Sequence, residues 1–433
     1  TAVLAHARRI DRFGGSDGYW SDHWTYCWDL LENYLQVYPE QARQALFDDR
    51  SFTFHDSPEV MLPRDIRFTL DERSGAVRQH NALAHDAEKA RMIAARAHDA
   101  ACVRTKHGAG SVYVTTLFEK LVCLAAVKFT ALDPEGLGIE MRGNRPGWND
   151  ALNGLPGLTG SSLNETAELL DLVRKLRAHA APAGSMTVFA ELAALLRGIS
   201  DATTSDASPL ARWHTLNDAR EHYLAAVRRG LDGASESLAF SDLHGVLAYM
   251  ETVLCNAMRG AHDARSGLYH GYFYYRVTTH RPVINDDGTP RIHDGRPCVW
   301  PVAFERETLP AYLEPQVRAM KVLEKHDACR ALHRAVQRSA LYDRGLQMYV
   351  LNASLARTSR DIGRAGVFPP GWLENQSVWL HMEYKYLLAL LRAGLHTEFF
   401  AAIAHALIPF QPPRRYGRSP LEHSSFIASS AHP

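Results

Sequence analysis

Recurring helical periodicity constrains the fold of this chain more than any other feature of its sequence. Apolar residues return every three or four positions in segments that we expect to be helices, at residues 19–35, 86–103, 112–132, 162–178, 186–196, 211–230, 238–262, 309–325, 328–340, 379–392 and 397–407. No sustained strand–helix–strand alternation separates them. Antiparallel helix pairs that close into a toroid accommodate 433 residues in one domain and place long loops at one mouth. We therefore predict an all-α fold, an (α/α)6 toroid or barrel, with 1–433 as a single catalytic domain.

Small β insertions interrupt this helical pattern. Residues 51–81 combine alternation with turn residues, and the aromatic run at 267–276 indicates a strand pair on the rim. We expect these insertions at the mouth of the toroid, with the Pro/Gly/Asp-rich stretch 282–301 as a candidate lid. The sequence ends at 424–433 without an element to close on, which suggests a piece of a longer protein.

Composition excludes several classes of function. Lys and Arg together number 48, as do Asp and Glu, so no global charge favours nucleic acid or an anionic membrane. The six cysteines form no C-x-x-C pair, and the 22 histidines show no metal-ligand spacing. We expect no metal, no cofactor and no membrane span. The absence of a signal-peptide pattern predicts a cytoplasmic location.

The segment 145–157, RPGWNDALNGLPG, holds the strongest chemical signal. Its glycines and prolines require a fixed turn, and a Ser-x-x-Glu cap at Ser162 opens the helix that follows. The loop presents Trp148, Asn149 and Asp150 together. The alternative is that Asn149 and Asp150 only bond the backbone of their own turn.

Two further segments carry aromatic and polar residues suited to sugars. Trp20, Trp24 and Trp28 recur at i, i+4, i+8 on one helix face, where Trp28 is best explained as core. The first two tryptophans lie beside Asp22 and His23 and could stack on a pyranose ring.

The second segment, 364–379, contains the functional candidates Trp372, Glu374, Asn375 and Gln376. Six of the eight tryptophans fall in these segments and the Asp150 loop, which favours a shared aromatic cleft. Glu383 is a weaker candidate because it lies within a helix.

The Trp148–Asp150 sequence with its Ser-x-x-Glu cap resembles the W-N-D segment of glycoside hydrolase family 94, the cellobiose phosphorylase family. Residues 19–22 lie where that family grips the donor sugar, and 416–430 are similar to its late segment near the active site, with Arg418 and His423 as anion candidates. The resemblance implies an (α/α)6 barrel, inversion at the anomeric carbon and Asp150 as the general acid. The chain departs from the family in lacking its amino-terminal β-sandwich, and 371–377 stand in place of its glycine-rich phosphate segment.

These observations predict an enzyme that cleaves or forms a β-glycosidic bond, foremost a phosphorylase of β-gluco-oligosaccharides with inorganic phosphate as co-substrate. Arg145 and Arg364 are candidates to hold that anion. An inverting hydrolase with Glu374 as base is the alternative, because hydrolysis needs a second carboxylate. A non-catalytic carbohydrate-binding domain is the second alternative. We expect an oligosaccharide as partner; a homodimer or association with the rest of a longer chain is left open.

Overall fold

The computed structural model describes residues 23–79, 82–143, 145–180, 184–202, 208–407, 410–412, 414 and 426–433. About 48% of the chain is helical and 20% lies in strands of small sheets. The chain is therefore helix-rich, as predicted, with more strand than an all-α fold contains. The closure of its helices into a toroid and its division into domains stay predictions.

The helices of more than one turn account for nearly every periodic segment of the sequence. They are α2 (His23–Val37), α4 (Ala87–Ala94), α5 (Leu117–Phe129), α6 (Leu163–His179), α7 (Ala190–Asp201), α8 (Pro209–Ala226), α9 (Phe240–Ala261), α10 (Glu314–Val322), α11 (His326–Arg338), α12 (Leu380–Arg392) and α13 (His396–Ala406). Shorter helical turns are η1 (Pro39–Gln41), η2 (Gln44–Asp48), α3 (Arg64–Arg67), η3 (Lys106–Gly108), η4 (Asp150–Leu152), η5 (Leu155–Leu158), η6 (Arg360–Ile362) and η7 (Arg364–Val367).

Helix α6 begins at the cap that the sequence predicted. The Ser162 side chain accepts a hydrogen bond from the backbone N–H of Asn164, which satisfies one of the free donors of the first turn. Glu165 accepts hydrogen bonds from the Trp24 indole and the Lys128 ammonium group. Its carboxylate thus ties α2 and α5 to the start of α6.

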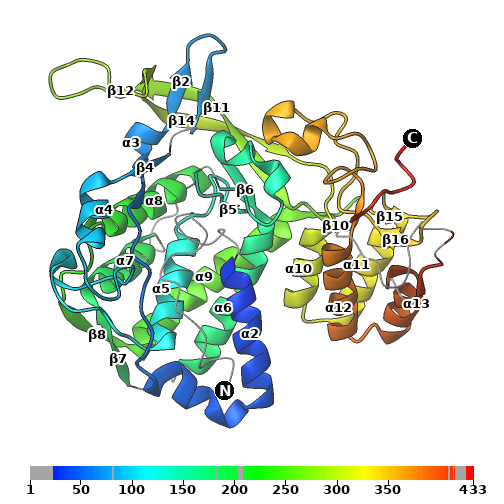
Figure 1. The fold of residues 1–433 in the computed structure, drawn as a ribbon, viewed down its shortest axis with the longest axis horizontal. Coiled ribbons are helices and arrows are strands. Elements are labelled where there is room, and N and C mark those ends of the chain that lie inside the picture. Colours follow the sequence, from blue (N-terminus) through cyan, green and yellow to red (C-terminus); the bar gives the residue numbers. More distant parts are fainter. Residues whose placement is uncertain are drawn as a thin grey trace.

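Helix α6 packs against helices from earlier and later parts of the chain. It contacts α9 and α10 most extensively, and also α5 and α2. Helix α10 in turn packs against α12, and α12 packs against α13. Figure 1 shows α10 to α13 together on one side of α6, with α5, α7, α8 and α9 on the other. Helix α6 therefore links the two groups of helices.

Several predicted helices were wrong at their ends, and two of them show the reason. The segment 86–103 is helical only as α4, because the next residues fold around Arg96, whose Nη1 donates to the Asp56 carboxylate at 2.8 Å and to two backbone carbonyls. The segment 186–196 begins as a strand, Ser185–Phe189, which pairs with Ser235–Ala239. Both errors arise from partners distant in the sequence.

The strands form small antiparallel sheets, one of which has four strands in the order β14-β11-β6-β5. The strands are β1 (Glu59–Met61), β2 (Thr69–Asp71), β3 (Ala76–Arg78), β4 (Leu83–His85), β5 (Ile139–Glu140), β6 (Gly160–Ser162), β7 (Ser185–Phe189), β8 (Ser235–Ala239), β9 (His262–Asp263), β10 (Leu268–Tyr269), β11 (Tyr272–Pro282), β12 (Ile292–His293), β13 (Arg296–Pro297), β14 (Val299–Thr308), β15 (Tyr342–Asp343), β16 (Met348–Tyr349), β17 (Val378–Trp379) and β18 (Phe426–Ile427). The predicted hairpin in 51–81 is β2–β3, and the aromatic run leads into the long pair β11–β14.

One connected core of buried side chains runs from Trp28 on α2 to Ala406 on α13. Trp28 is 4% exposed and donates from Nε1 to Asp171 on α6 at 2.8 Å, so the core interpretation of this residue is confirmed. All six cysteines are free thiols. Among the described residues, none of the helices is long and apolar enough to cross a membrane.

Candidate active site

The loop that carries Asp150 consists of two short 3-10 turns, η4 and η5, as its glycines and prolines require. Asp150 is the first residue of η4, and its carboxylate forms an ion pair with Arg364 at 2.8 Å. Asn149 is 3% exposed, and neither polar atom of its side chain has a hydrogen-bond partner. The alternative that these two side chains serve only their own turn therefore has no support in the geometry.

A second segment, 359–367, is fixed onto this loop by backbone contacts. The Gly154 N–H donates to the Ile362 carbonyl at 3.0 Å, and the Arg364 N–H donates to the Asn153 side-chain oxygen at 3.1 Å. A Cβ atom on Gly363, which has φ of +123°, would collide with Asn153. This close approach sets the position of Arg364 beside Asp150.

Arg364 also connects Asp150 to Glu374. Its Nη2 atom lies 2.8 Å from the Asp150 Oδ2 atom and 4.0 Å from the Glu374 Oε1 atom, so these two oxygens are less than about 7 Å apart, the sum of the two distances. Pairs of catalytic carboxyl groups in glycosidases are roughly 5–5.5 Å apart in retaining enzymes and 6.5–9.5 Å apart in inverting ones. The structure thus brings together the two carboxylates that the sequence singled out.

Glu374 lies in a tightly turned and largely buried loop. Its side chain is 12% exposed. Burial raises its pKa, and the negative charge of Asp150 raises it further, whereas its own backbone N–H and the Arg364 guanidinium lower it. Leu373 and Gln376 on either side have positive φ of 46° and 62°, which fixes the carboxylate within a rigid turn.

Aromatic rings from two segments pack beside the loops that carry these carboxylates. The Trp148 ring packs edge-on against Trp379, with centroids 6.5 Å apart, and lies tilted by 35° against the His381 ring at 5.5 Å. Trp379 donates from Nε1 to the Leu373 carbonyl at 3.0 Å. Trp148 and Trp379 are therefore anchored to the Glu374 loop.

The last described residues, 426–433, also pack against the Glu374 loop and its flanking strand β17. Strand β18 pairs with β17, and Trp372, which is 39% exposed, packs edge-on against Phe426 at 5.0 Å. The Ser429 N–H donates to the Gly371 carbonyl at 3.1 Å. The late segment named by the family resemblance thus reaches the candidate site, although Arg418 and His423 lie outside the described residues.

Asn375 and Gln376, the residues after Glu374, bond to neighbouring segments through different groups. Asn375 donates from Nδ2 to the Phe368 carbonyl at 2.7 Å, and its buried Oδ1 atom has no partner. The Gln376 backbone N–H donates to the Asn352 side chain at 3.2 Å. Asn375 therefore keeps one free acceptor.

Other candidates from the sequence have different surroundings. Arg145 pairs with Glu59 at 3.0 Å, and the same carboxylate pairs with Arg142 at 2.6 Å. Trp24 donates to Glu165, and His23 is the first residue of α2. Trp20 and Asp22 lie outside the described residues. Glu383 is fully buried and accepts from the Tyr349 N–H at 2.8 Å, so it is part of the core.

Sequence analysis missed two basic residues at the start of α12. Loss of hydration, then the positive charges of Lys385 and Arg318, lower the pKa of His381 to about 4. Loss of hydration and Arg318 likewise lower the pKa of Lys385 to about 8. The Lys385 Nζ atom lies 4.3 Å from the Tyr26 ring centroid and has no hydrogen-bond partner. Their i, i+4 spacing at a helix start was the available signal.

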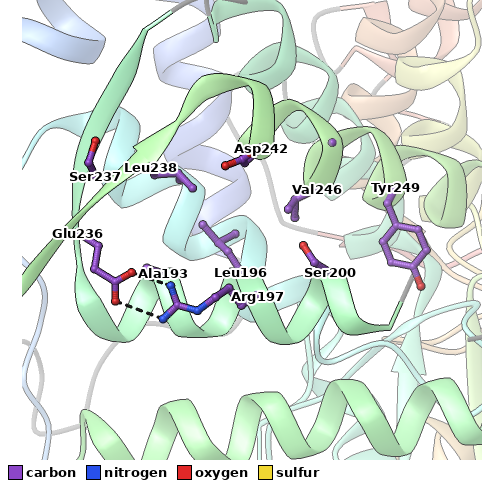
Figure 2. A pocket seen from close by; sticks show the side chains of 11 residues that line it. Ala193, Leu196, Arg197, Ser200, Glu236, Ser237, Leu238, Asp242, Val246 and Tyr249 are labelled. Carbon is purple, nitrogen blue, oxygen red and sulfur yellow. Dashed lines mark hydrogen bonds and ion pairs between the residues drawn. The ribbon is translucent and has the colours of Figure 1, made fainter. Parts of the chain in front are cut away.

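A cavity of about 660 Å³ lies between α7, β8 and α9. Figure 2 shows that aliphatic and polar side chains line it together, with an ion pair between Arg197 and Glu236 at 2.6 Å. None of the predicted site residues lines it.

Within the described ranges, His, Cys, Asp and Glu side chains form no group of three that could hold a metal ion. No protein-family model matches the chain, and no curated protein matches it in sequence.

Proposed function

We propose that the chain is a carbohydrate-active enzyme, a phosphorylase of β-linked gluco-oligosaccharides built on an (α/α)6 toroid. The observation that supports this proposal most is Arg364, whose guanidinium lies beside Asp150 and within 4.0 Å of Glu374. Its side chain is 47% exposed, so a phosphate ion has access to its remaining N–H donors. Guanidinium groups bind phosphate by paired, charge-assisted hydrogen bonds.

In this proposal Asp150 is the general acid. It donates its proton to the glycosidic oxygen as the bond to the anomeric carbon breaks, and a phosphate oxygen forms the new bond from the opposite face. The products are an α-sugar 1-phosphate and a sugar shortened by one unit. A bound phosphate competes with Asp150 for Arg364, and the hydroxyl of that phosphate gives its proton to Asp150 once the new bond has formed, which restores the acid for the next turnover.

The aromatic rings beside the carboxylates suit a sugar substrate. Trp148 and the exposed Trp372 offer flat apolar faces of the kind that pack on pyranose rings. Asn149 and the Oδ1 atom of Asn375 are buried polar groups without partners. Buried polar groups that lack partners are costly, and sugar hydroxyls would satisfy them.

An inverting hydrolase is the second candidate, and Glu374 is the observation that favours it. The Glu374 Oε1 and Asp150 Oδ2 atoms are less than about 7 Å apart, so a second carboxylate lies near the acid, as hydrolysis requires. This upper limit reaches only the lower end of the range of roughly 6.5–9.5 Å used by inverting hydrolases. In that reaction Glu374 takes a proton from water while Asp150 protonates the leaving oxygen.

Product analysis separates the two reactions. The chain is incubated with β-linked gluco-oligosaccharides, with and without phosphate, and sugar 1-phosphate and reducing sugar are measured. Sugar 1-phosphate formed only with phosphate supports the phosphorylase. Reducing sugar released equally without phosphate supports the hydrolase. Asp327→Asn, which changes a fully exposed carboxylate on α11, is the control for Asp150→Asn. If the chain binds the sugar without turning it over, both the phosphorylase and the hydrolase proposals are wrong, and the chain has a non-catalytic binding role.

A further inference from the structure

A second cavity, of about 430 Å³, lies between the β2–β3 hairpin, strand β11 and the turn before η6. Its volume is within the range of roughly 300–1,000 Å³ that small-molecule sites occupy. None of the predicted catalytic or sugar-binding residues lines it. The residues with polar side chains that line it are Ser74, Arg78, Tyr274, Tyr275, Arg276, Thr278, Ser359 and Asp361.

Tyr274 is the aromatic centre of this cavity. It lies on the same face of β11 as Arg276, because alternate residues of a strand share a face. Burial raises the pKa of the Tyr274 phenol; the carboxylates of Glu307 and Asp361 raise it further, and Arg276 and Arg78 oppose them. Charged groups of both signs from four elements therefore surround the phenol.

Carboxylates already pair with both arginines of the cavity. Arg78 pairs with Asp361 at 2.8 Å, and Arg276 pairs with Glu305 on β14. Glu307 lies within 4.0 Å of the Arg276 guanidinium. An anionic ligand would have to displace these carboxylates. A neutral ligand rich in hydroxyl groups can use both the donors and the acceptors, and the phenol ring gives it an apolar surface.

We propose that this cavity is a second carbohydrate site, which binds a neutral oligosaccharide apart from the Asp150 site. The proposal rests on the proposed function for its substrate class. Ring stacking on Tyr274 supplies most of the affinity, and the Arg78–Asp361 pair bonds the sugar hydroxyls.

The cavity shares two segments with the candidate active site. Leu158, at the end of the Asp150 loop, forms part of its lining. The Gln79 N–H donates to the Gly157 carbonyl at 2.9 Å, which attaches the chain after β3 to the same loop. Asp361 belongs to η6, and Arg364 begins η7 directly after it. A glycan held here is therefore anchored beside the loops that carry Asp150 and Arg364.

The test is a binding titration, which needs no turnover. In an Asp150→Asn background, a β-linked gluco-oligosaccharide is titrated by calorimetry and its stoichiometry measured. We expect two sites, of which Tyr274→Ala removes one, while Tyr274→Phe weakens that site only a few-fold. Arg78→Met should weaken the same site about ten-fold, corresponding to one lost hydrogen bond to a charged group. Arg197→Met, at the ion pair of Figure 2, is the matched control and should change nothing.

The outcomes separate this inference from the proposed function. Binding that Tyr274→Ala and Arg78→Met leave unchanged overturns the second site, whether or not the chain is an enzyme. If binding depends on Tyr274 but the wild-type chain shows no turnover, the second site stands and the phosphorylase proposal is overturned. Thermal unfolding verifies that each variant is folded; if Tyr274→Ala is not, Arg78→Met, at a side chain 25% exposed, decides the matter.

Discussion

Replacing Glu383 by Gln should make the stability of this protein less dependent on pH. Glu383 is fully buried; one oxygen accepts the Tyr349 N–H, and the other has no partner. Burial raises its pKa from 4.5 to about 8, and only the Tyr349 bond opposes the shift. Glutamine has the same shape, keeps the acceptor for Tyr349 and never ionises.

The sign follows from the raised pKa. The folded protein binds the proton more tightly than the unfolded chain, so this contribution to stability is complete below pH 4.5 and is lost as the pH rises to about 8. At 1.36 kcal/mol per pKa unit the loss is on the order of 5 kcal/mol. Glu383→Gln should therefore match the wild type near pH 5 and exceed it by several kcal/mol at pH 8.5.

Urea unfolding at a series of pH values measures this difference. Glu324→Gln, at a side chain 76% exposed on the surface, serves as the control and should follow the wild-type pH profile. If Glu383→Gln shows the same pH profile as the wild type, Glu383 is not a buried protonated acid and the explanation is wrong.

Two further predictions concern the contact that positions Arg364. Gly363→Ala should lower the free energy of unfolding by about 1–3 kcal/mol and reduce turnover, because the left-handed backbone and the contact with Asn153 leave no room for a methyl group. Gly288→Ala, where the space is open, should cost less and leave turnover intact, and equal effects would contradict this. Arg364→Met should leave the melting temperature nearly unchanged, because partly exposed ion pairs contribute about 0–1 kcal/mol, while the KM for phosphate rises at least ten-fold; an unchanged KM would remove Arg364 from the phosphate site.

Local sequence patterns predicted the helices well. Periodic segments such as 238–262 and 379–392 became α9 and α12 with boundaries shifted by one or two residues, because their apolar faces pack along the whole length. Segment 186–196 was wrong at its start because Ser185–Phe189 finds a strand partner in β8. No local pattern encodes that partner.

The candidate site was predictable only in part. Glycines and prolines around Asp150 predicted an irregular loop, and Trp148 and Trp372 marked its surroundings. The pairing of Asp150 with Arg364 depends on the close backbone approach at Gly154 and Gly363, which joins segments far apart in the sequence. Only the structure reveals such a contact.

The most direct test of the central claim is the turnover of Asp150→Asn on two substrates that differ in leaving group. A β-linked gluco-disaccharide needs a proton on its leaving oxygen, whereas β-glucosyl fluoride departs with little acid assistance. If Asp150 is the general acid, Asp150→Asn loses about 10²–10⁴-fold in turnover of the disaccharide. The same variant keeps most of its turnover of the fluoride in the presence of phosphate. The control Asp327→Asn keeps its turnover of both substrates. Equal losses on both substrates, or no loss on the disaccharide, would contradict the assignment of Asp150 as the acid.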